Sequence, residues 1–245
     1  QKDKNLGLSS ENFGVFTLQR KVLDRSNISL IFVNKQKTET SEIDSSNNLF
    51  NRNLGLEYNY FSKDNLWNGK VLFLKSLSPT KEEQGNVYAS HIGYQSTRWN
   101  WRIQQEYISN NYTAEVGYIP RKNYLKLQVK GGYLNYTKKE TILLSHGPSV
   151  SQTYFFDSKL DNKDQLISLK YLFNFKNRSQ LSIGFQNQFI QLLSNFDPLR
   201  TGIAFLDEGT SHKWNNFTIS YNSKPQNRFT YSLETISGGY YSEGK

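Results

Sequence analysis

The 245-residue chain contains no cysteine and no methionine. Without cysteine, no disulfide can stabilise the fold and no thiolate can act as a nucleophile, although this absence does not decide the redox compartment. The chain also lacks an initiator residue and a positively charged, apolar secretion signal at its start. We therefore expect a mature or trimmed segment.

Long apolar runs and linkers are missing as well. No stretch approaches the ~20 consecutive apolar residues that a transmembrane helix requires, and the mean hydropathy is polar at −0.69. No Pro-rich, Gly/Ser-rich or charged linker divides the chain, and no segment has a convincing helical period. These absences exclude a helical membrane protein and predict one domain over residues 1–245.

What the chain does contain is a two-residue alternation. From Gln165 to Phe175, large apolar residues such as Ile167 and Leu169 alternate with polar ones such as Ser168. Because successive side chains of a strand point to opposite sides of a sheet, this pattern predicts a strand with one apolar and one polar face. The same alternation predicts strands at Phe13–Val22, Asn27–Lys37, Arg52–Phe61, Lys70–Leu77, Asn86–Gln95, Arg98–Ile108, Tyr124–Tyr136, Thr141–His146, Thr153–Leu160, Gln165–Lys176, Gln180–Leu192, Trp214–Asn222 and Arg228–Ile236.

The lengths of these strands and connections favour a membrane protein. Strands of roughly ten residues match the ~9 to 11 that cross a bilayer at a tilt, whereas strands in soluble proteins usually have about five or six. Short and long connections roughly alternate, as in membrane barrels, except between Thr137 and Asp164, where we expect a miscounted strand around 145–151. We predict an all-β, antiparallel transmembrane β-barrel portion with about 12 or 13 strands.

The net charge of +9 raises the question of nucleic-acid binding. Lysine and arginine are spread over predicted loops and polar strand faces and do not cluster, so we expect no nucleic-acid partner. On the polar faces, we expect charged residues to line the interior of the barrel. They are Arg98, Arg102, Glu106, Lys126, Lys130 and Lys170.

Residues 115–121, Glu-Val-Gly-Tyr-Ile-Pro-Arg, form the most distinctive local motif. Gly117 can adopt backbone angles closed to other residues, Pro120 cannot donate to a sheet ladder, and Glu115 and Arg121 carry opposite charges. We expect a folded-in loop or bulge held by an ion pair. A constriction or docking point is the functional alternative.

Two tryptophans open a strand directly after a short turn at Gln95–Thr97, namely Trp99 and Trp101. This places them at a predicted membrane boundary, where amphipathic rings form a girdle at headgroup depth. A sugar-stacking platform that also uses Trp67 and Trp214 is the alternative.

The sequence offers little catalytic chemistry. The histidines, His91, His146 and His212, are far apart and have no cysteine beside them, so we expect no metal and no cofactor. Ser145 and His146 are the candidates for a barrel-wall hydrolase, in which such residues meet through geometry and not through sequence order. A glycosidase needs two carboxyl groups roughly 5 to 10 Å apart, but single acids on polar faces are more often partners of Arg and Lys. The acids concerned are Glu57, Glu106, Glu115 and Glu234.

Four stretches are distinctive together: FTLQRKVLDRSNISLIFVN (16–34), the Trp99/Trp101 pair after Ser96, AEVGYIPR (114–121) and GGYYSEG (238–244). In these residues the chain resembles an uncharacterised family of Bacteroidota outer-membrane barrel proteins. Longer members of that family begin with a domain like carbohydrate-binding module family nine. The resemblance implies an interior barrel portion with no established activity, and closure by strands that lie outside this chain.

We therefore predict a non-enzymatic outer-membrane protein of a Gram-negative envelope, acting as a pore wall, an anchor for a surface domain or a component of a complex. Its expected partners are outer-membrane lipid, missing barrel strands and other envelope proteins, with glycan bound only through a domain outside this chain. Two alternatives remain open. One is a secreted, soluble β-sandwich that binds glycans, and the other is a barrel-wall hydrolase of lipid or glycan that depends on Ser145 or His146.

Overall fold

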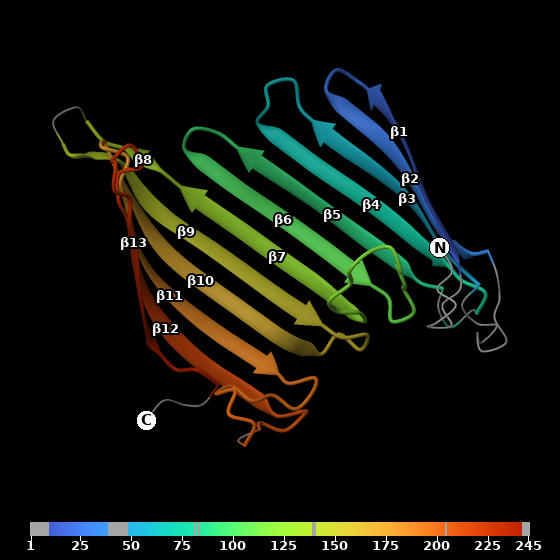
Figure 1. Ribbon diagram of the computed structural model, residues 1–245. Coiled ribbons are helices and arrows are strands. Elements are labelled where there is room, and N and C mark those ends of the chain that lie inside the picture. Colours follow the sequence, from blue (N-terminus) through green and yellow to red (C-terminus); the bar gives the residue numbers. More distant parts are fainter. Residues whose placement is uncertain are drawn as a thin grey trace. The chain divides into compact units, whose positions relative to one another are not determined.

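The computed structural model describes residues 10–38, 49–80, 82, 84–138, 141–203 and 205–241. Within these residues the chain is all-β and contains no α-helix (Figure 1). Accordingly, the described residues contain no helix of the length and apolarity needed to cross a membrane. The strands are β1 (Glu11–Val22), β2 (Ser26–Lys37), β3 (Phe50–Phe61), β4 (Trp67–Leu77), β5 (Asn86–Gln95), β6 (Trp99–Ile108), β7 (Tyr124–Tyr133), β8 (Asn135–Tyr136), β9 (Leu143–Phe156), β10 (Asn162–Phe175), β11 (Gln180–Gln191), β12 (Ser211–Asn222) and β13 (Ser232–Gly238).

The thirteen strands belong to one antiparallel sheet whose order follows the chain, β1-β2-β3-β4-β5-β6-β7-β9-β10-β11-β12-β13, with β8 paired to β9. The predicted all-β, antiparallel class and strand number are therefore confirmed. Because the described strands form one sheet, they do not show the two packed sheets of a sandwich. No pairing joins β1 to β13 in the described part of the chain, so closure into a barrel is not seen there.

Several predicted strand boundaries are wrong: Tyr124–Tyr136 is divided into β7 and β8, the strand predicted from Arg228 begins at Ser232, and one strand was predicted as two. The two strands predicted at Thr141–His146 and Thr153–Leu160 are a single strand, β9, that continues through Gly147 and Pro148. These two residues usually mark a turn, but here Pro148 lies opposite Tyr171 in the register between β9 and β10. With β9 counted as one strand, the connections still do not alternate strictly in length here, because 134–142 comprises 9 residues and 157–161 only 5.

The connections fall into two groups because the strands alternate in direction. At one end of the strands they comprise 3 to 9 residues: 23–25, 62–66, 96–98, 134–142, 176–179 and 223–231. We call this the short-turn end. At the other end they comprise 5 to 19 residues: 38–49, 78–85, 109–123, 157–161 and 192–210.

The chain divides into two compact units, which we describe separately. Unit 1 contains residues 1–92 and 104–125, and unit 2 contains residues 93–103 and 126–245. In unit 1, Ile31, Gly55 and Leu74 lie side by side on β2, β3 and β4. In unit 2, a row across β10, β11 and β12 contains Leu169, Phe185 and Phe217. The single-domain expectation stays a prediction.

The described residues contain very little apolar core. Only five large apolar or aromatic side chains are buried, which are Val87, Tyr112, Tyr124, Leu192 and Trp214. Serine, threonine and asparagine outnumber them among the buried residues, whereas many Leu, Ile, Val and Phe side chains are exposed. This distribution is the reverse of that in an ordinary soluble domain.

Candidate functional site

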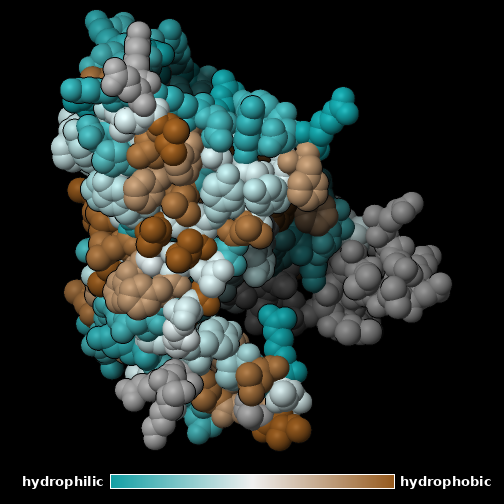
Figure 2. Space-filling model, turned by 90° about the vertical axis from the view of Figure 1, so that its left-hand side faces the viewer, coloured by the Kyte–Doolittle hydropathy of each residue, from teal (hydrophilic) through white to brown (hydrophobic). Residues whose placement is uncertain are grey.

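The apolar face of unit 2 is built from successive rows of side chains that the register aligns across the strands. The central row contains Val150, Leu169, Phe185 and Phe217. The next row toward the short-turn end contains Pro148, Tyr171, Ile183 and Ile219, and the row after that contains His146, Phe173, Leu181 and Tyr221. Leu169 is 50% exposed and Ile219 is 53% exposed, so this face has no cover within unit 2. Figure 2 shows hydrophobic side chains gathered in a central belt, with hydrophilic ones above and below.

Polar amides on this face satisfy one another. In the row beyond Leu169, the amide of Asn187 donates to the side-chain oxygen of Asn215 at 2.7 Å. The amide of Gln165, one row further, donates to Asn187 at 3.3 Å. Since an unpaired amide is costly to remove from water, this chain of hydrogen bonds is what an apolar surrounding requires.

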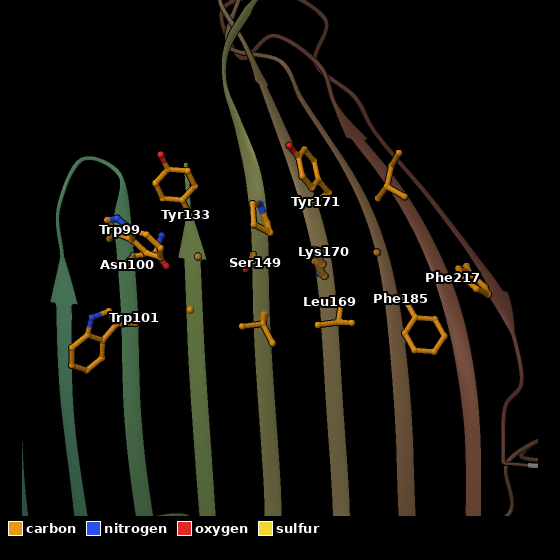
Figure 3. Close-up of a pocket in the computed structure, with 16 residues that line it drawn as sticks. Trp99, Asn100, Trp101, Tyr133, Ser149, Leu169, Lys170, Tyr171, Phe185 and Phe217 are labelled. Atoms are coloured by element: carbon orange, nitrogen blue, oxygen red, sulfur yellow. The ribbon is translucent and has the colours of Figure 1, made fainter. Parts of the chain in front are cut away.

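An open hollow of about 890 Å³ lies on the apolar face of unit 2. Its walls include Trp99 and Trp101 on β6, Tyr133 on β7, and the rows around Leu169 and Phe185 (Figure 3). Gly131 forms part of the floor of the hollow, where a Cβ would come into ordinary contact with Val150 at 3.7 Å and Trp101 at 4.0 Å. The hollow is therefore an apolar surface bordered by aromatic rings.

The polar face of unit 2 has a different composition. Opposite Lys170 lies Gly184, and the neighbouring rows contain Ser168 beside Gln186 and Leu172 beside Ser182. Hydroxyl and amide groups dominate this face, and several of them are buried, including Ser168, Asn216 and Thr218. A surface of this kind suits contact with water or with a polar ligand.

An aromatic cluster covers one end of that polar face. The ring of Tyr241 lies 4.9 Å from Trp214 and 4.8 Å from Phe196. Trp214 is only 8% exposed. A second hollow, of about 460 Å³, lies beside the cluster and is lined by Lys126, Gln128, Asp164, Gln188 and others. Trp214 therefore lies on the polar face and not on the face that contains Trp99 and Trp101.

The apolar face of unit 1 repeats the pattern of unit 2. Leu30, Leu56 and Phe73 form one row across β2, β3 and β4, and Leu56 is 52% exposed. At the end of this face away from the short turns, the guanidinium of Arg52 donates to the side-chain oxygen of Asn34 at 3.0 Å. The apolar band of unit 1 thus ends at a polar border.

The connection between β6 and β7 folds over the polar face of unit 1. We call its residues 109–117 the strap. Asn51 on β3 is its main anchor, because its amide donates to the carbonyl and hydroxyl oxygens of Thr113, both at 3.3 Å. The Asn51 oxygen accepts from the backbone N–H of Glu115 at 3.1 Å. Asn51 is 1% exposed, so the strap seals it from solvent.

Ionic and aromatic contacts hold both ends of the strap. The Nζ atom of Lys35 on β2 lies 2.7 Å from Glu115 and 3.0 Å from Glu11 on β1. Closer to β6, the backbone of Tyr112 packs against Gly85, and the side chain of Tyr112 is buried, which raises the pKa of its phenol. The ionic contact of Glu115 thus reaches Lys35, 80 residues away in the sequence, and the expected loop or bulge held by an ion pair within residues 115–121 stays a prediction.

The other residues of the expected loop motif continue the connection. The backbone N–H of Gly117 donates to the carbonyl of Ala114 at 3.1 Å, which makes a tight turn. The guanidinium of Arg121 lies 5.7 Å from the centre of the Tyr124 ring. Pro120 lies between these two contacts, in a part of the connection without strand structure.

Most of the residues expected to line the barrel interior lie on the polar face of their strands. Contacts and strand register show this. Asn100 faces Gly132, so alternation places Arg102 on the same side of β6. Lys126, Lys130 and Lys170 also lie on polar faces by alternation or register. Glu106 accepts a hydrogen bond from Tyr124 on β7, and Arg98 lies in the exposed turn before β6. That these faces line an interior stays a prediction.

Trp99 and Trp101 lie on the apolar face of unit 2. The ring of Trp99 is 4.6 Å from that of Tyr133, and Trp101 stacks against Tyr94 at 6.3 Å. Trp99 is the first residue of β6 and therefore lies at the short-turn end. This position is the one that a girdle requires, and the girdle itself stays a prediction.

The candidate hydrolase residues point to opposite faces of β9. Ser145 accepts a hydrogen bond from Asn174 at 3.0 Å on the polar face. His146 lies on the apolar face, with its Nδ1 atom 2.6 Å from the hydroxyl of Tyr171. These neighbours therefore do not form a nucleophile and base pair with each other.

Two of the four candidate acids bind lysines. Glu57 lies 2.5 Å from the Nζ atom of Lys70, and Glu115 contacts Lys35 as described. Across the described ranges, no group of three or more His, Cys, Asp or Glu side chains could hold a metal ion. Sequence patterns gave no sign of Asn51 and Lys35, because their partners are far along the chain and nothing local distinguishes them.

The sheet and its two unlike faces define an all-β protein of a single meandering sheet. The sequence of residues 7–244 matches the family described as "Domain of unknown function (DUF5916)", and the chain belongs to that family. No curated protein and no solved structure matches the chain significantly.

Proposed function

We propose that this chain forms part of the wall of a transmembrane β-barrel in the outer membrane of a Gram-negative bacterium. In this proposal the apolar faces of both units contact lipid and the polar faces line the interior. The role is non-enzymatic, as a pore wall that also carries or docks other envelope components. The resemblance to outer-membrane barrel proteins of Bacteroidota supports this assignment.

The observation that carries the proposal is the inverted burial. Buried positions are filled mainly by Ser, Asn and Thr, and exposed ones by rows of Leu, Ile, Val and Phe. In water, contiguous apolar surface of this extent would drive association. In a bilayer it is the expected outer surface of a barrel, with a polar interior behind it.

The height of the apolar band fits a bilayer. From Tyr221 to Lys213 on β12 the band spans eight residue steps, which is ~27 Å along an antiparallel strand at about 3.4 Å per step. A tilt of about 40° reduces this to ~20 Å along the membrane normal, close to the ~25 Å of known barrels. Aromatic residues lie at both limits, Phe173 and Tyr221 at one and Tyr154 and Phe189 at the other.

The same reasoning requires partners for the edge strands. A bilayer does not tolerate unpaired backbone N–H and C=O groups, so the outer edges of β1 and β13 must be paired in the membrane. We include in the proposal that further strands complete the barrel. Side-chain placement favours the non-enzymatic role, because Ser145 and His146 face apart and Glu57 and Glu115 bind lysines.

The decisive experiment follows the full-length protein in its native cells. We expect it in the detergent-soluble outer-membrane fraction, with a mobility in SDS gels that changes on boiling, because closed barrels resist SDS until heated. Recovery in the soluble fraction with no change on boiling would contradict the proposal. In that case the apolar rows would have to be buried against another protein or a second copy of the chain.

A further inference from the structure

We propose that the hollow on the apolar face of unit 2 binds an anionic phospholipid, whose phosphate contacts basic residues at the short-turn end. The acyl chains would lie in the hollow between Trp101, Gly131 and Leu169. This inference rests on the proposed function, since it requires that the apolar face meet lipid. It adds a specific site and a lipid class to that general contact.

The charge of the short-turn end carries the inference. In unit 2 the connections 96–98, 134–142, 176–179 and 223–231 contain seven Lys or Arg residues and a single acid, Glu140. Arg98, Arg178, Lys224 and Arg228 are all exposed. In unit 1 the short connections are balanced, since Asp24 pairs with Lys63 at 2.8 Å. The excess of positive charge therefore belongs to the unit that has the hollow.

The opposite end of unit 2 has the opposite sign. Its connections 157–161 and 192–210 contain five acids and two bases. An anionic headgroup is thus attracted to one end of these strands and repelled from the other. A uniform coat of surface charge for solubility would not produce this separation.

The hollow lies close to the basic end. Arg98 directly precedes Trp99, which lines the hollow, and the carbonyl of Arg98 accepts a hydrogen bond from Leu134 at 2.8 Å. The hydroxyl of Tyr136 on β8 donates to the carbonyl of Thr97 at 3.1 Å, and this bond holds the turn 96–98 against β8. A lipid with its chains in the hollow therefore has its phosphate within reach of cationic side chains.

Quenching of tryptophan by lipids brominated on the acyl chain tests the site. The full-length protein is reconstituted in bilayers that contain brominated phosphatidylglycerol or brominated phosphatidylcholine. The signal of Trp99 and Trp101 is the difference between the protein and the W99F/W101F variant. We expect stronger quenching by the anionic lipid, and equal quenching by the two lipids would overturn the proposal.

Matched variants locate the headgroup and the chains. Each basic residue near an anionic surface raises the binding constant about fivefold. The double variant R98Q/R178Q should therefore lower the preference for phosphatidylglycerol over phosphatidylcholine by tenfold or more. The control K159Q/R200Q makes the same charge change at the opposite end and should leave the preference unchanged. G131L fills the hollow without changing charge and should weaken quenching by the anionic lipid.

A second reporter separates failure of this site from failure of the proposed function. In the W99F/W101F background, I219W places a tryptophan on the apolar face outside the hollow. Quenching of I219W but not of Trp99 and Trp101 would show that a protein covers the hollow, which overturns the lipid site alone. Absence of quenching at both places, with the protein soluble, would overturn the proposed function itself.

Discussion

At the scale of single residues, Gly147 shows why a turn-like dipeptide lies inside a strand. A Cβ atom on Gly147 would overlap the carbonyl oxygen of Tyr133 and lie 2.9 Å from its carbon. The neighbouring strand is interrupted there, because β7 ends at Tyr133 and β8 begins at Asn135. Glycine therefore permits an irregular crossing of two backbones that no other residue would allow.

This contact gives a direct prediction. Gly147→Val should destabilise the protein by about 3 kcal/mol, because its side chain would overlap the backbone carbonyl of Tyr133. Gly14→Ala, where a Cβ would meet no atom within 4 Å, is the control and should change stability by less than about 0.5 kcal/mol. Urea unfolding of the full-length protein in detergent compares the two, and equal stability of both variants would contradict this account.

Asp197 gives a prediction about pH. The backbone N–H of Gly202 donates to its carboxylate at 2.6 Å and lowers the pKa of Asp197 below its usual value, and the N–H of Leu199 adds a bond at 3.0 Å. A lowered pKa means that these bonds stabilise the loop above the pKa of the unfolded state and are lost as pH falls through the folded value.

The amide resonance of Gly202 in NMR spectra should therefore shift toward its unbonded position as the pH is lowered through the acidic range. Asp197→Asn removes the titrating group and should abolish this shift. The matched variant Asp207→Asn should leave it intact. A shift that persists in Asp197→Asn would assign the titration to a different group.

At the scale of structural elements, the strap is a connection that contacts strands it does not join, namely β2 and β3. Asn51 supplies three of its polar contacts, and the loss of this side chain leaves buried donors and acceptors unsatisfied. We expect Asn51→Ala to destabilise the strap by about 2–3 kcal/mol. Hydrogen exchange of residues 112–116 should accelerate while exchange in β3 and β4 changes little.

The exposed Asn12 on β1 offers a control, since Asn12→Ala removes the same group without uncovering a buried one. Exchange of the strap should be unaffected in this variant. If Asn51→Ala accelerated hydrogen exchange equally in the strap and in β3 and β4, the strap would unfold together with the sheet and would not be a separately anchored element.

At the scale of the whole molecule, the two faces of each unit lead to opposite expectations for the same substitution. Ile219 and Ser220 are neighbours on β12 and point to opposite sides. If the apolar face meets lipid, Ile219→Lys should cost about 2–4 kcal/mol of stability in a bilayer, and Ser220→Lys should be tolerated. In a soluble protein, lysine would be accepted at the exposed Ile219. Folding yield in bilayers, measured for both variants, distinguishes these two cases.

Much of this architecture could be predicted from the sequence, because strand alternation is a local signal. The rows that contain Ile167 and Leu169 follow directly from the two-residue period. The hollow and the strap could not be predicted, since they depend on register and on contacts between distant residues. Nothing near Lys35 identifies Glu115 as its partner, and nothing in β7 shows that Gly131 lies between Trp101 and Val150.

Each main strand pairs with the main strand that precedes it in the chain. For folding kinetics, this means that the sheet consists of local hairpins, and tight connections such as 23–25 and 96–98 close at little entropic cost. Each finished hairpin presents an edge on which the next can form without threading. The sheet can therefore grow stepwise, with every completed edge serving as the template for the strand that follows.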